Sequence, residues 1–394
     1  MSTSRSAPAT ASSPELRRRH RARVHAQRRR RPGLSALLRR LLLGLLASLG
    51  TLVTVHAQVA PGTLPTGANV ASGSAQLQTL PNQLIVHQGS ARLGLDWSSF
   101  SIGSAATVEF RQPGRDAVAL NRVLGSDPSL IYGRLQANGQ VFLSNPNGVL
   151  FAPGAQVDVG ALVATTLDLS QQDFADGRLR FAGGSAQAVR NDGRITAAEG
   201  GYVALFGREV HNRGEISVPA GSVLLASGSA ATVSIAGHGL LSAVVTPGAP
   251  GSVANAGQIV ADGGSVRLSA QSAEGLAASL VNNSGVVRAR AMVQRGGEIW
   301  ITGDEVASSG RVDADGMAGA DGGRVLVRGG MVQGRLDLAG QVSARAGAGG
   351  AGGQVETSAA FVAIAPETRV DTRAADRRHG SWTIDPTDFT VGPG

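Results

Sequence analysis

The 394-residue sequence contains no cysteine, so it can form no disulfide and has no thiol for nucleophilic or metal chemistry. Aromatic residues make up only 4% of the chain and charged residues 16%, whereas glycine occurs 55 times. A chain of this kind reverses direction often and fills its interior with small aliphatic side chains. We therefore expect short stacked strands rather than a bundle of helices.

Lysine is also absent, and all 36 basic residues are arginine. The formal net charge of +8 would on its own favour a nucleic-acid ligand. Residues 1–40, however, contain 12 arginines and a single acidic residue, Glu15, which is a charge of +11 and leaves −3 for the rest of the chain. The positive charge belongs to the first segment, and we expect no nucleic-acid partner.

The first 57 residues have the order of a secretory signal peptide. An arginine-rich region is followed by an apolar run from Leu41 to Val55 and by a small-residue site that ends at Ala57. Cleavage there would leave Gln58 as the first residue. The apolar run is 15 residues long and contains two glycines, whereas a membrane-spanning helix needs about 20 residues. A cleaved signal peptide is therefore favoured over a permanent membrane anchor.

Residues 121–166 alternate short apolar runs with turn residues. We expect strands at residues 141–143, 149–151 and 157–159. Between the first two strands lies Asn145-Pro146-Asn147-Gly148, which has Asn, Pro and Gly at the places that a type I turn prefers. The sequence therefore predicts a chain reversal at residues 145–148.

From Asn191 onward the chain repeats itself. An Asn-x-Gly-x-Ile/Val pattern begins at residues 191, 212, 255 and, in a looser form, 283, and a glycine-led alternating pattern begins at residues 200, 221, 263, 296, 322 and 352. A unit of about 20 residues with two or three short strands is typical of one coil of a β-solenoid. We expect an all-β, right-handed parallel β-helix with an irregular amino-terminal capping region. We also expect the asparagine of each repeat to adopt a left-handed conformation at a corner.

Two segments carry a resemblance to a known family. Residues 95–113 (LDWSSFSIGSAATVEFRQP) and residues 121–166 (beginning NRVLGSDPSLIYG) are similar to the amino-terminal secretion domain of the filamentous haemagglutinin family, the exoproteins of two-partner secretion. The resemblance implies that an outer-membrane transporter recognises this region and that β-helix formation outside the cell helps to pull the chain through. It further implies a secretion motif at Asn145, Pro146, Asn147 and Gly148, supported by Asn121, Arg122, Asn138 and Gly139.

The resemblance and the repeats together suggest how the chain is divided. We expect a signal peptide with an extended arginine-rich region at residues 1–57, the secretion (haemagglutination activity) domain at 58–175, β-helix repeats at 176–372 and a tail, truncated relative to larger members, at 373–394. Two roles compete for residues 145–148. They could form a structural turn, or their asparagine side chains could meet the transporter, and the turn role is favoured.

Residues that could support catalysis or metal binding are scattered. His87, His211, His238 and His379 lack the close spacing of metal ligands. The aspartates of the segment 313–321 match neither of the common calcium patterns and read as a polar turn. Acidic residues lie mostly in turns rather than in a catalytic cluster. We therefore expect no enzymatic activity, no metal site and no cofactor.

The signal peptide and the family resemblance together imply an exoprotein of a Gram-negative bacterium, which we expect to reach the cell surface or the medium by Sec export and passage through the outer membrane. An adhesin or haemagglutinin-like function is favoured, with a host-cell surface or a glycan as ligand and a monomer during export. The alternatives are a fragment of a haemolysin or contact-dependent toxin and, less favoured, a polysaccharide-active β-helix enzyme.

Overall fold

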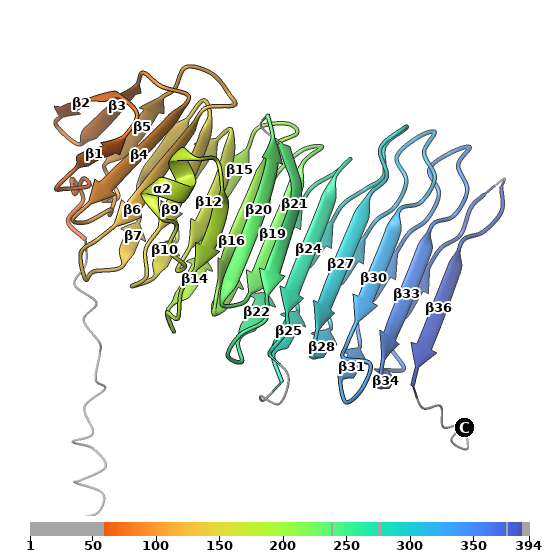
Figure 1. Cartoon of the computed structure of the whole chain (residues 1–394). Coiled ribbons are helices and arrows are strands. Elements are labelled where there is room, and N and C mark those ends of the chain that lie inside the picture. Colours follow the sequence, from red (N-terminus) through yellow and green to blue (C-terminus); the bar gives the residue numbers. More distant parts are fainter. Residues whose placement is uncertain (1–58, 238, 274–277, 376, 388–394) are drawn as a thin grey trace, which may run out of the picture. The chain divides into compact units, whose positions relative to one another are not determined.

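The computed structural model describes residues 59–387 except 238, 274–277 and 376. In this part of the chain the strands stack coil upon coil into a parallel β-helix (Figure 1). The expected signal peptide and its cleavage site at Ala57 and Gln58 lie outside the described residues. No helix in the described part has the length and apolarity that a membrane crossing requires.

Each complete coil contributes one strand to each of three sheets, which we call sheets I, II and III. Sheet I contains, in spatial order, β1 (Asn69–Ser72), β4 (Arg92–Trp97), β6 (Val118–Val123), β9 (Gln140–Ser144), β12 (Ala161–Thr165), β16 (Tyr202–Gly207), β19 (Ser222–Ser227), β24 (Ser265–Ala270), β27 (Glu298–Gly303), β30 (Arg324–Arg328), β33 (Gln354–Ala359) and β36 (Ser381–Pro386). Sheet II contains β7 (Ser129–Ile131), β10 (Val149–Phe151), β14 (Ala188–Asn191), β17 (Glu209–Asn212), β22 (Ser252–Asn255), β25 (Leu280–Asn283), β28 (Glu305–Ser308), β31 (Arg335–Leu338) and β34 (Phe361–Ile364). Sheet III contains β2 (Ala75–Leu80), β3 (Gln83–Gln88), β5 (Thr107–Arg111), β8 (Arg134–Ala137), β11 (Gln156–Val159), β15 (Arg194–Ala197), β18 (Glu215–Ser217), β23 (Gln258–Val260), β26 (Val286–Arg288), β29 (Arg311–Asp313), β32 (Gln341–Ser343) and β35 (Arg369–Asp371).

The interior of the β-helix is built from columns of aliphatic side chains. Strand pairing places Val203, Val223, Val266, Ile299 and Val325 in register on successive coils of sheet I, and all five are buried. Such β-branched residues pack well on a pleated surface. The predicted β-helix is therefore confirmed, and so are the strands expected around residues 141–143, 149–151 and 157–159.

The irregular amino-terminal cap is also present. Strands β1 and β2 run antiparallel to β4 and β3, respectively, whereas the strands that follow in the three sheets pair in parallel. An antiparallel strand at each of these positions covers the edge that the first parallel strand would otherwise expose. At the other end, residues 381–386 of the expected tail form β36, which pairs in parallel with β33 and extends sheet I.

The predicted role of the repeat asparagines is wrong. Asn191, Asn212, Asn255 and Asn283 each end a strand of sheet II, none has a positive φ, and all four are fully buried. Their side chains form a ladder along the stack, in which each Nδ2 donates to the Oδ1 of the next asparagine at 2.8, 2.8 and 2.9 Å. The ladder satisfies buried amides that would otherwise be costly, and it fixes the register between coils.

The glycine of the same repeat is required by close packing rather than by a positive φ. A Cβ on Gly214 would overlap the carbonyl oxygen of Gly193 in the preceding coil, and one on Gly257 would overlap that of Gly214. Successive coils therefore approach too closely at this corner for any side chain.

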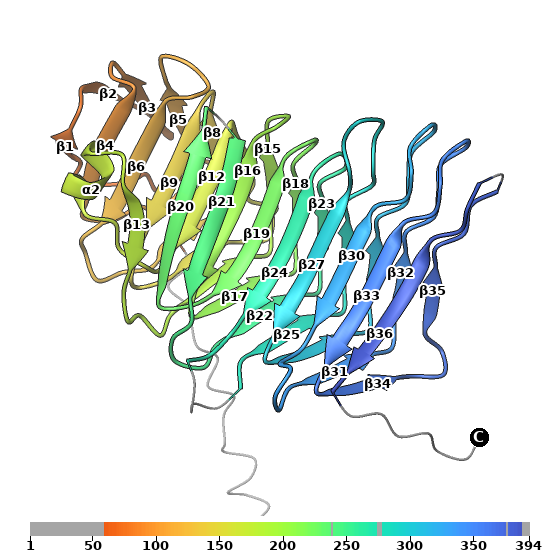
Figure 2. The ribbon, with the colours of Figure 1, turned by 45° about the vertical axis from the view of Figure 1, so that its right-hand side comes forward.

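A second layer, which the sequence analysis did not predict, covers part of sheet I on its outer face (Figures 1 and 2). It consists of the short helix α2 (Gln171–Ala175) and a three-stranded sheet formed by β13 (Leu179–Ala182), β20 (Ala230–Ala236) and β21 (Gly239–Thr246). Phe174 and Phe181 of this layer pack with Phe142 and Phe206 of sheet I, and the Phe181 and Phe206 rings meet edge to face with centroids 4.9 Å apart. The layer forms a second hydrophobic core outside the coils.

Candidate functional site: the Asn-Pro-Asn-Gly turn

Residues 145–148 form the corner between β9 of sheet I and β10 of sheet II. The backbone N–H of Gly148 donates to the carbonyl of Asn145 at 3.0 Å, which closes the predicted four-residue turn. Gly148 has a φ of +109°, a conformation that any other residue adopts only with strain. The presence of glycine at the fourth position therefore follows from the backbone geometry.

The side chain of Asn145 is buried, and its polar atoms bond within the fold. Its Nδ2 donates to the carbonyl of Asp127 at 3.0 Å and to Oγ of Ser129 at 3.0 Å. Its Oδ1 accepts a hydrogen bond from the backbone N–H of Asn147 at 2.9 Å. The same Oδ1 also accepts from Nδ2 of Asn147 at 3.3 Å. An amide that donates twice and accepts twice in this way has little capacity left for another protein.

Asn147 and Pro146 are closer to solvent than Asn145. The Nδ2 of Asn147 donates to the carbonyl of Gly125 at 2.8 Å, so this half-buried side chain also holds the preceding coil. Pro146 is exposed, and its carbonyl accepts a hydrogen bond from Ser185. Of the four residues, Pro146 therefore presents the most accessible surface.

The turn joins three successive coils. The N–H of Asn145 donates to the carbonyl of Thr165 in the following coil at 3.0 Å, and the carbonyl of Gly148 accepts from Ser129 in the preceding coil at 3.0 Å. Together with the side-chain bonds, these contacts fix the corner from both sides. The arrangement fits an element that sets the alignment of consecutive coils.

Asn121, the first of the supporting residues, lies inside the same part of the β-helix. Its side chain is fully buried, and its Oδ1 accepts a hydrogen bond from Nε1 of Trp97 at 3.0 Å. Its Nδ2 donates to the carbonyls of Ala119 and Phe142 at 3.3 and 3.2 Å. Asn121 therefore satisfies a buried indole and the backbone of the next coil.

Arg122 points to the opposite face of sheet I. Its guanidinium lies 3.1 Å from the carboxylate of Asp168, at the start of the outer layer, and 3.8 Å from that of Asp96. The side chain of Arg122 is only 18% exposed. Its place in the motif is therefore explained by the attachment of the outer layer to the coils.

Asn138 and Gly139 form another corner, together with a residue that sequence reasoning missed. Asn138 exchanges two hydrogen bonds with the backbone of Gln112, at 2.8 and 2.9 Å, and the N–H of Gly139 donates to Oε1 of Gln112 at 2.9 Å. The buried Nε2 of Gln112 also bonds to Oε1 of Gln88 at 3.0 Å. Gln112 stands directly before a Pro-Gly turn, and this was the available signal for a corner residue.

Sheet I contributes a buried tyrosine, Tyr202 of β16, to the second core beneath the outer layer. The hydroxyl of Tyr202 donates to Oε1 of Gln140 at 2.6 Å, and burial raises the pKa of this hydroxyl far above its ordinary value. Tyr202 therefore remains neutral and acts as a hydrogen-bonding part of the second core.

The other candidates do not come together in one site. His87, His211 and His379 lie on different coils, and His238 lies outside the described residues. Asp315 pairs with Arg345 at 2.6 Å, and Asp321 accepts a hydrogen bond from the backbone of Ala351. Within the described residues no group of three histidine or acidic side chains could hold a metal ion.

Comparison with known proteins identifies the family of this chain. The family model described as the TPS (two-partner secretion) secretion domain matches residues 61–316, which is more than half of the chain. The chain belongs to the two-partner secretion family. Its secretion domain places it among proteins that are exported across the outer membrane to the cell surface or the medium, with an outer-membrane transporter as partner.

Known members of the two-partner secretion family resemble the chain in sequence and in structure. A heme/hemopexin-binding protein of Haemophilus influenzae is 34% identical over 267 residues, which cover 64% of this chain and 29% of that protein. The HMW1 secretion domain of Haemophilus influenzae has a TM-score of 0.60 at 25% identity and covers 82% of this chain and 100% of that domain. The filamentous hemagglutinin secretion domain has a TM-score of 0.48 at 15% identity and covers 82% of this chain and 99% of that domain.

The chain spans less than a third of the curated relative's length. The two-partner secretion match continues past residue 175, where the sequence analysis ended the secretion domain, and that division of the chain stays a prediction.

Proposed function

We propose that residues 145–148 serve export by shaping the first coils of the β-helix, on which the later coils then stack. The observation that supports this most strongly is the Asn145 side chain, which is buried and bonds to Asp127, Ser129 and Asn147. A transporter that met the folded turn would find mainly Pro146 and part of Asn147. The role as a structural turn is therefore favoured over direct recognition of the asparagines.

Folding in this order gives the turn a function in transport. Coils of a solenoid contact mainly their neighbours, so each new coil adds strand pairs and buries apolar side chains on the coil before it. Coils that fold outside the cell cannot slide back, which biases movement outward without ATP. A turn that connects three coils near the start of the stack would set the register for this growth.

Two variants separate the competing roles of the turn. Asn147→Ala removes the bond to Gly125, whereas Pro146→Ala changes the exposed position and removes no side-chain hydrogen bond. Export is measured in cells that contain the transporter, and folding is measured separately on the purified protein. We expect Asn147→Ala to lower export and folding together and Pro146→Ala to leave both close to normal. Failed export of either variant with normal folding would favour recognition by the transporter.

We further propose that the exported protein acts as an adhesin that binds a cell surface or a glycan. We also propose that it is a monomer during export. The long sheets favour the adhesin function, because they expose extended faces rather than one deep cleft. The family match and the named relatives are secretion and binding proteins rather than enzymes. Retention of the exported protein on host cells or on a glycan array tests the proposal. Release of sugar from a polysaccharide would instead support the enzyme, and lysis of target cells the toxin or haemolysin fragment.

Binding of heme or hemopexin is a second candidate, which rests on the name of the curated relative. Titration of heme and of hemopexin with the exported protein tests it directly. A shifted heme absorbance band, or saturable binding of hemopexin, would favour this function over adhesion.

A further inference from the structure

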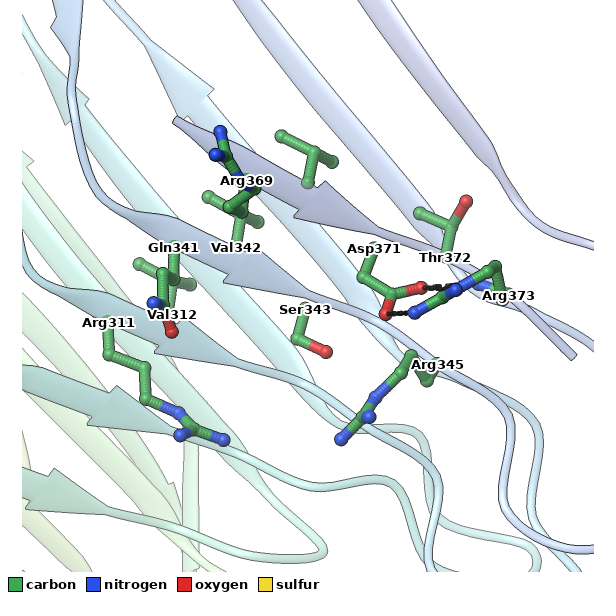
Figure 3. A pocket seen from close by; sticks show the side chains of 11 residues that line it. Arg311, Val312, Gln341, Val342, Ser343, Arg345, Arg369, Asp371, Thr372 and Arg373 are labelled. Carbon is green, nitrogen blue, oxygen red and sulfur yellow. Dashed lines mark hydrogen bonds and ion pairs between the residues drawn. The ribbon is translucent and has the colours of Figure 1, made fainter. Parts of the chain in front are cut away.

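The outer face of sheet III holds an arginine-lined groove near β29, β32 and β35. The groove has a volume of about 710 Å³, and Arg311, Arg345, Arg369 and Arg373 line it (Figure 3). A second hollow of about 550 Å³ shares Arg345 and Arg373 with the first and adds Arg290. We call the two hollows together the arginine groove.

Aspartates beneath the surface hold these arginines in place. Asp315 and Arg345 form a two-bond pair at 2.6 and 3.0 Å, and Asp371 and Arg373 form another at 2.7 and 2.9 Å. The side chains of Arg345 and Arg373 are 50% and 76% exposed, whereas those of their aspartates are 10% and 24% exposed. The carboxylates therefore fix the guanidinium forks from below, and the outward N–H groups remain open to a ligand.

Positive charge is in excess along the groove. Arg290 and Arg311 share one carboxylate, that of Asp313, at 3.2 Å each, and the Asp313 side chain is only 2% exposed. Arg369 donates to the backbone carbonyls of Pro366 and Thr368. Five arginines thus stand against the three aspartates 313, 315 and 371, a net of two positive charges on a chain that is otherwise net negative beyond residue 40.

The spacing of the arginines follows the coils. Arg311 and Arg369 occupy the same register position two coils apart, and strands in a sheet lie about 4.8 Å apart, so the two residues stand roughly 10 Å apart along the stack. None of the residues that line the two hollows is aromatic. The groove is therefore suited to repeated anionic groups on an extended chain rather than to stacking of a neutral ring.

We propose that the arginine groove binds a linear acidic polysaccharide through its carboxylate or sulfate groups. This inference rests on the proposed surface-binding function and names the chemical class of its ligand. The bidentate arginine forks match planar carboxylates and sulfate oxygens. A ligand that runs across β29, β32 and β35 would contact several coils at once.

Binding of the exported protein to polygalacturonate, dextran sulfate and neutral dextran tests the inference. We expect binding to at least one of the two anionic polymers and none to dextran, and the preferred polymer distinguishes carboxylate from sulfate recognition. The double variant Arg311→Gln/Arg369→Gln leaves Asp313 paired with Arg290. It should weaken binding about tenfold or more, because charge-assisted hydrogen bonds are lost. Arg324→Gln/Arg328→Gln removes the same charge from one strand of sheet I, β30, and should change affinity less than about twofold.

Three results would overturn the inference. They are no binding to either anionic polymer at low salt, equal weakening by the two double variants, and equally tight, groove-dependent binding of a single-stranded oligonucleotide. If the double variant fails to fold, the single variant Arg369→Gln replaces it in the binding test. The Arg369 side chain donates to the backbone carbonyls of Pro366 and Thr368, so its loss should disturb the fold little. Export of the same variants should be normal, so a failure of polysaccharide binding leaves the proposed role of the turn unaffected.

Discussion

The coils around the Asn-Pro-Asn-Gly turn and the coils that follow the outer layer differ in how sheet I is buried. Strands β9, β12 and β16 are buried at every position, whereas β24 and β27 alternate between buried and half-buried residues. We call the first group the covered coils and the strands from β24 onward, with their coils, the bare coils. The same backbone repeat thus supports two kinds of packing, and the outward side chains determine which one forms.

The difference matters for function because the turn belongs to the covered coils. Phe142 of β9, three residues before Asn145, packs against Phe174 and Phe181 of the outer layer. The corner therefore receives apolar support from outside as well as hydrogen bonds from neighbouring coils. The bare coils depend on their interior columns and on surface ion pairs such as Asp371–Arg373. We infer that the covered coils are the stable base of the stack.

The largest expected effect is the loss of an aromatic ring from the outer layer. Phe181→Ala should lower the free energy of unfolding by about 3–5 kcal/mol, because it leaves a cavity between two layers. Phe361→Ala, on a bare coil where the ring is 54% exposed, should change it by less than about 0.5 kcal/mol. Urea unfolding of the exported protein checks both. Equal losses would remove the distinction between the two regions.

A matched leucine pair sharpens the comparison. Leu224 and Leu326 occupy the same outward column of sheet I, but Leu224 is 3% exposed beneath the outer layer and Leu326 is half-buried on a bare coil. Leu224→Ala should cost about 2–5 kcal/mol and Leu326→Ala about 1 kcal/mol or less. Denaturation midpoints of the two variants provide the measurement, and a larger loss for Leu326→Ala would contradict the account.

The turn itself should contribute less than the aromatic core. Asn145→Ala should destabilise the protein by about 1–3 kcal/mol, because the N–H of Asn147 and the carbonyl of Asp127 lose their partner. Asn282→Ala, on an exposed position of β25, should stay within about 0.5 kcal/mol of the parent. Thermal unfolding of both variants measures these changes in stability. An Asn145→Ala protein with unchanged thermal stability would show that the buried amide is dispensable for folding.

The smallest expected effect is the response of the bare coils to acid. The hydrogen bond from Arg373 lowers the pKa of Asp371. Burial alone would raise the pKa of Asp315, but hydrogen bonds from Arg345 and Ser343 outweigh burial, so the pKa of Asp315 is also lowered. These folded pKa values lie below the unfolded value of about 3.9. The ion pairs therefore contribute their full stabilisation of the folded protein at pH values above about 3.9. The stabilisation is lost as the pH falls through the folded values. Stability measured from pH 6 to 2 should therefore decline at the acidic end, and less steeply in Asp371→Asn.

Much of the fold could be predicted from local patterns. The strands at residues 141–143, 149–151 and 157–159 and the turn at 145–148 follow from short-range alternation and turn chemistry, which act within a few residues. The general repeat was visible because the Asn-x-Gly and glycine-led patterns recur from coil to coil, although the spacing between them is uneven. The supporting residues, such as Asn121, were predicted only from the family resemblance. Local patterns do not reveal them, because their contacts, such as that of Asn121 with Trp97, join residues on successive coils.

The parts that were missed depend on contacts between distant segments. The Asn-x-Gly pattern has the composition of a turn, but Asn212 can form its ladder only because Asn191 and Asn255 stand above and below it. The outer layer pairs β13 with β20, roughly 50 residues later in the chain. A usable signal was the apolar run of β12 and β16, which departs from strict alternation and indicates strands buried on both faces.

Hydrogen exchange of the backbone amides in the exported protein tests the central claim most directly. If the covered coils are the stable base, amides in β9, β12 and β16 will exchange most slowly and those in β30 and β33 faster. Asn145→Ala should then speed exchange first around β9 and β10. Uniform exchange along sheet I, or slower exchange in the bare coils, would contradict the claim.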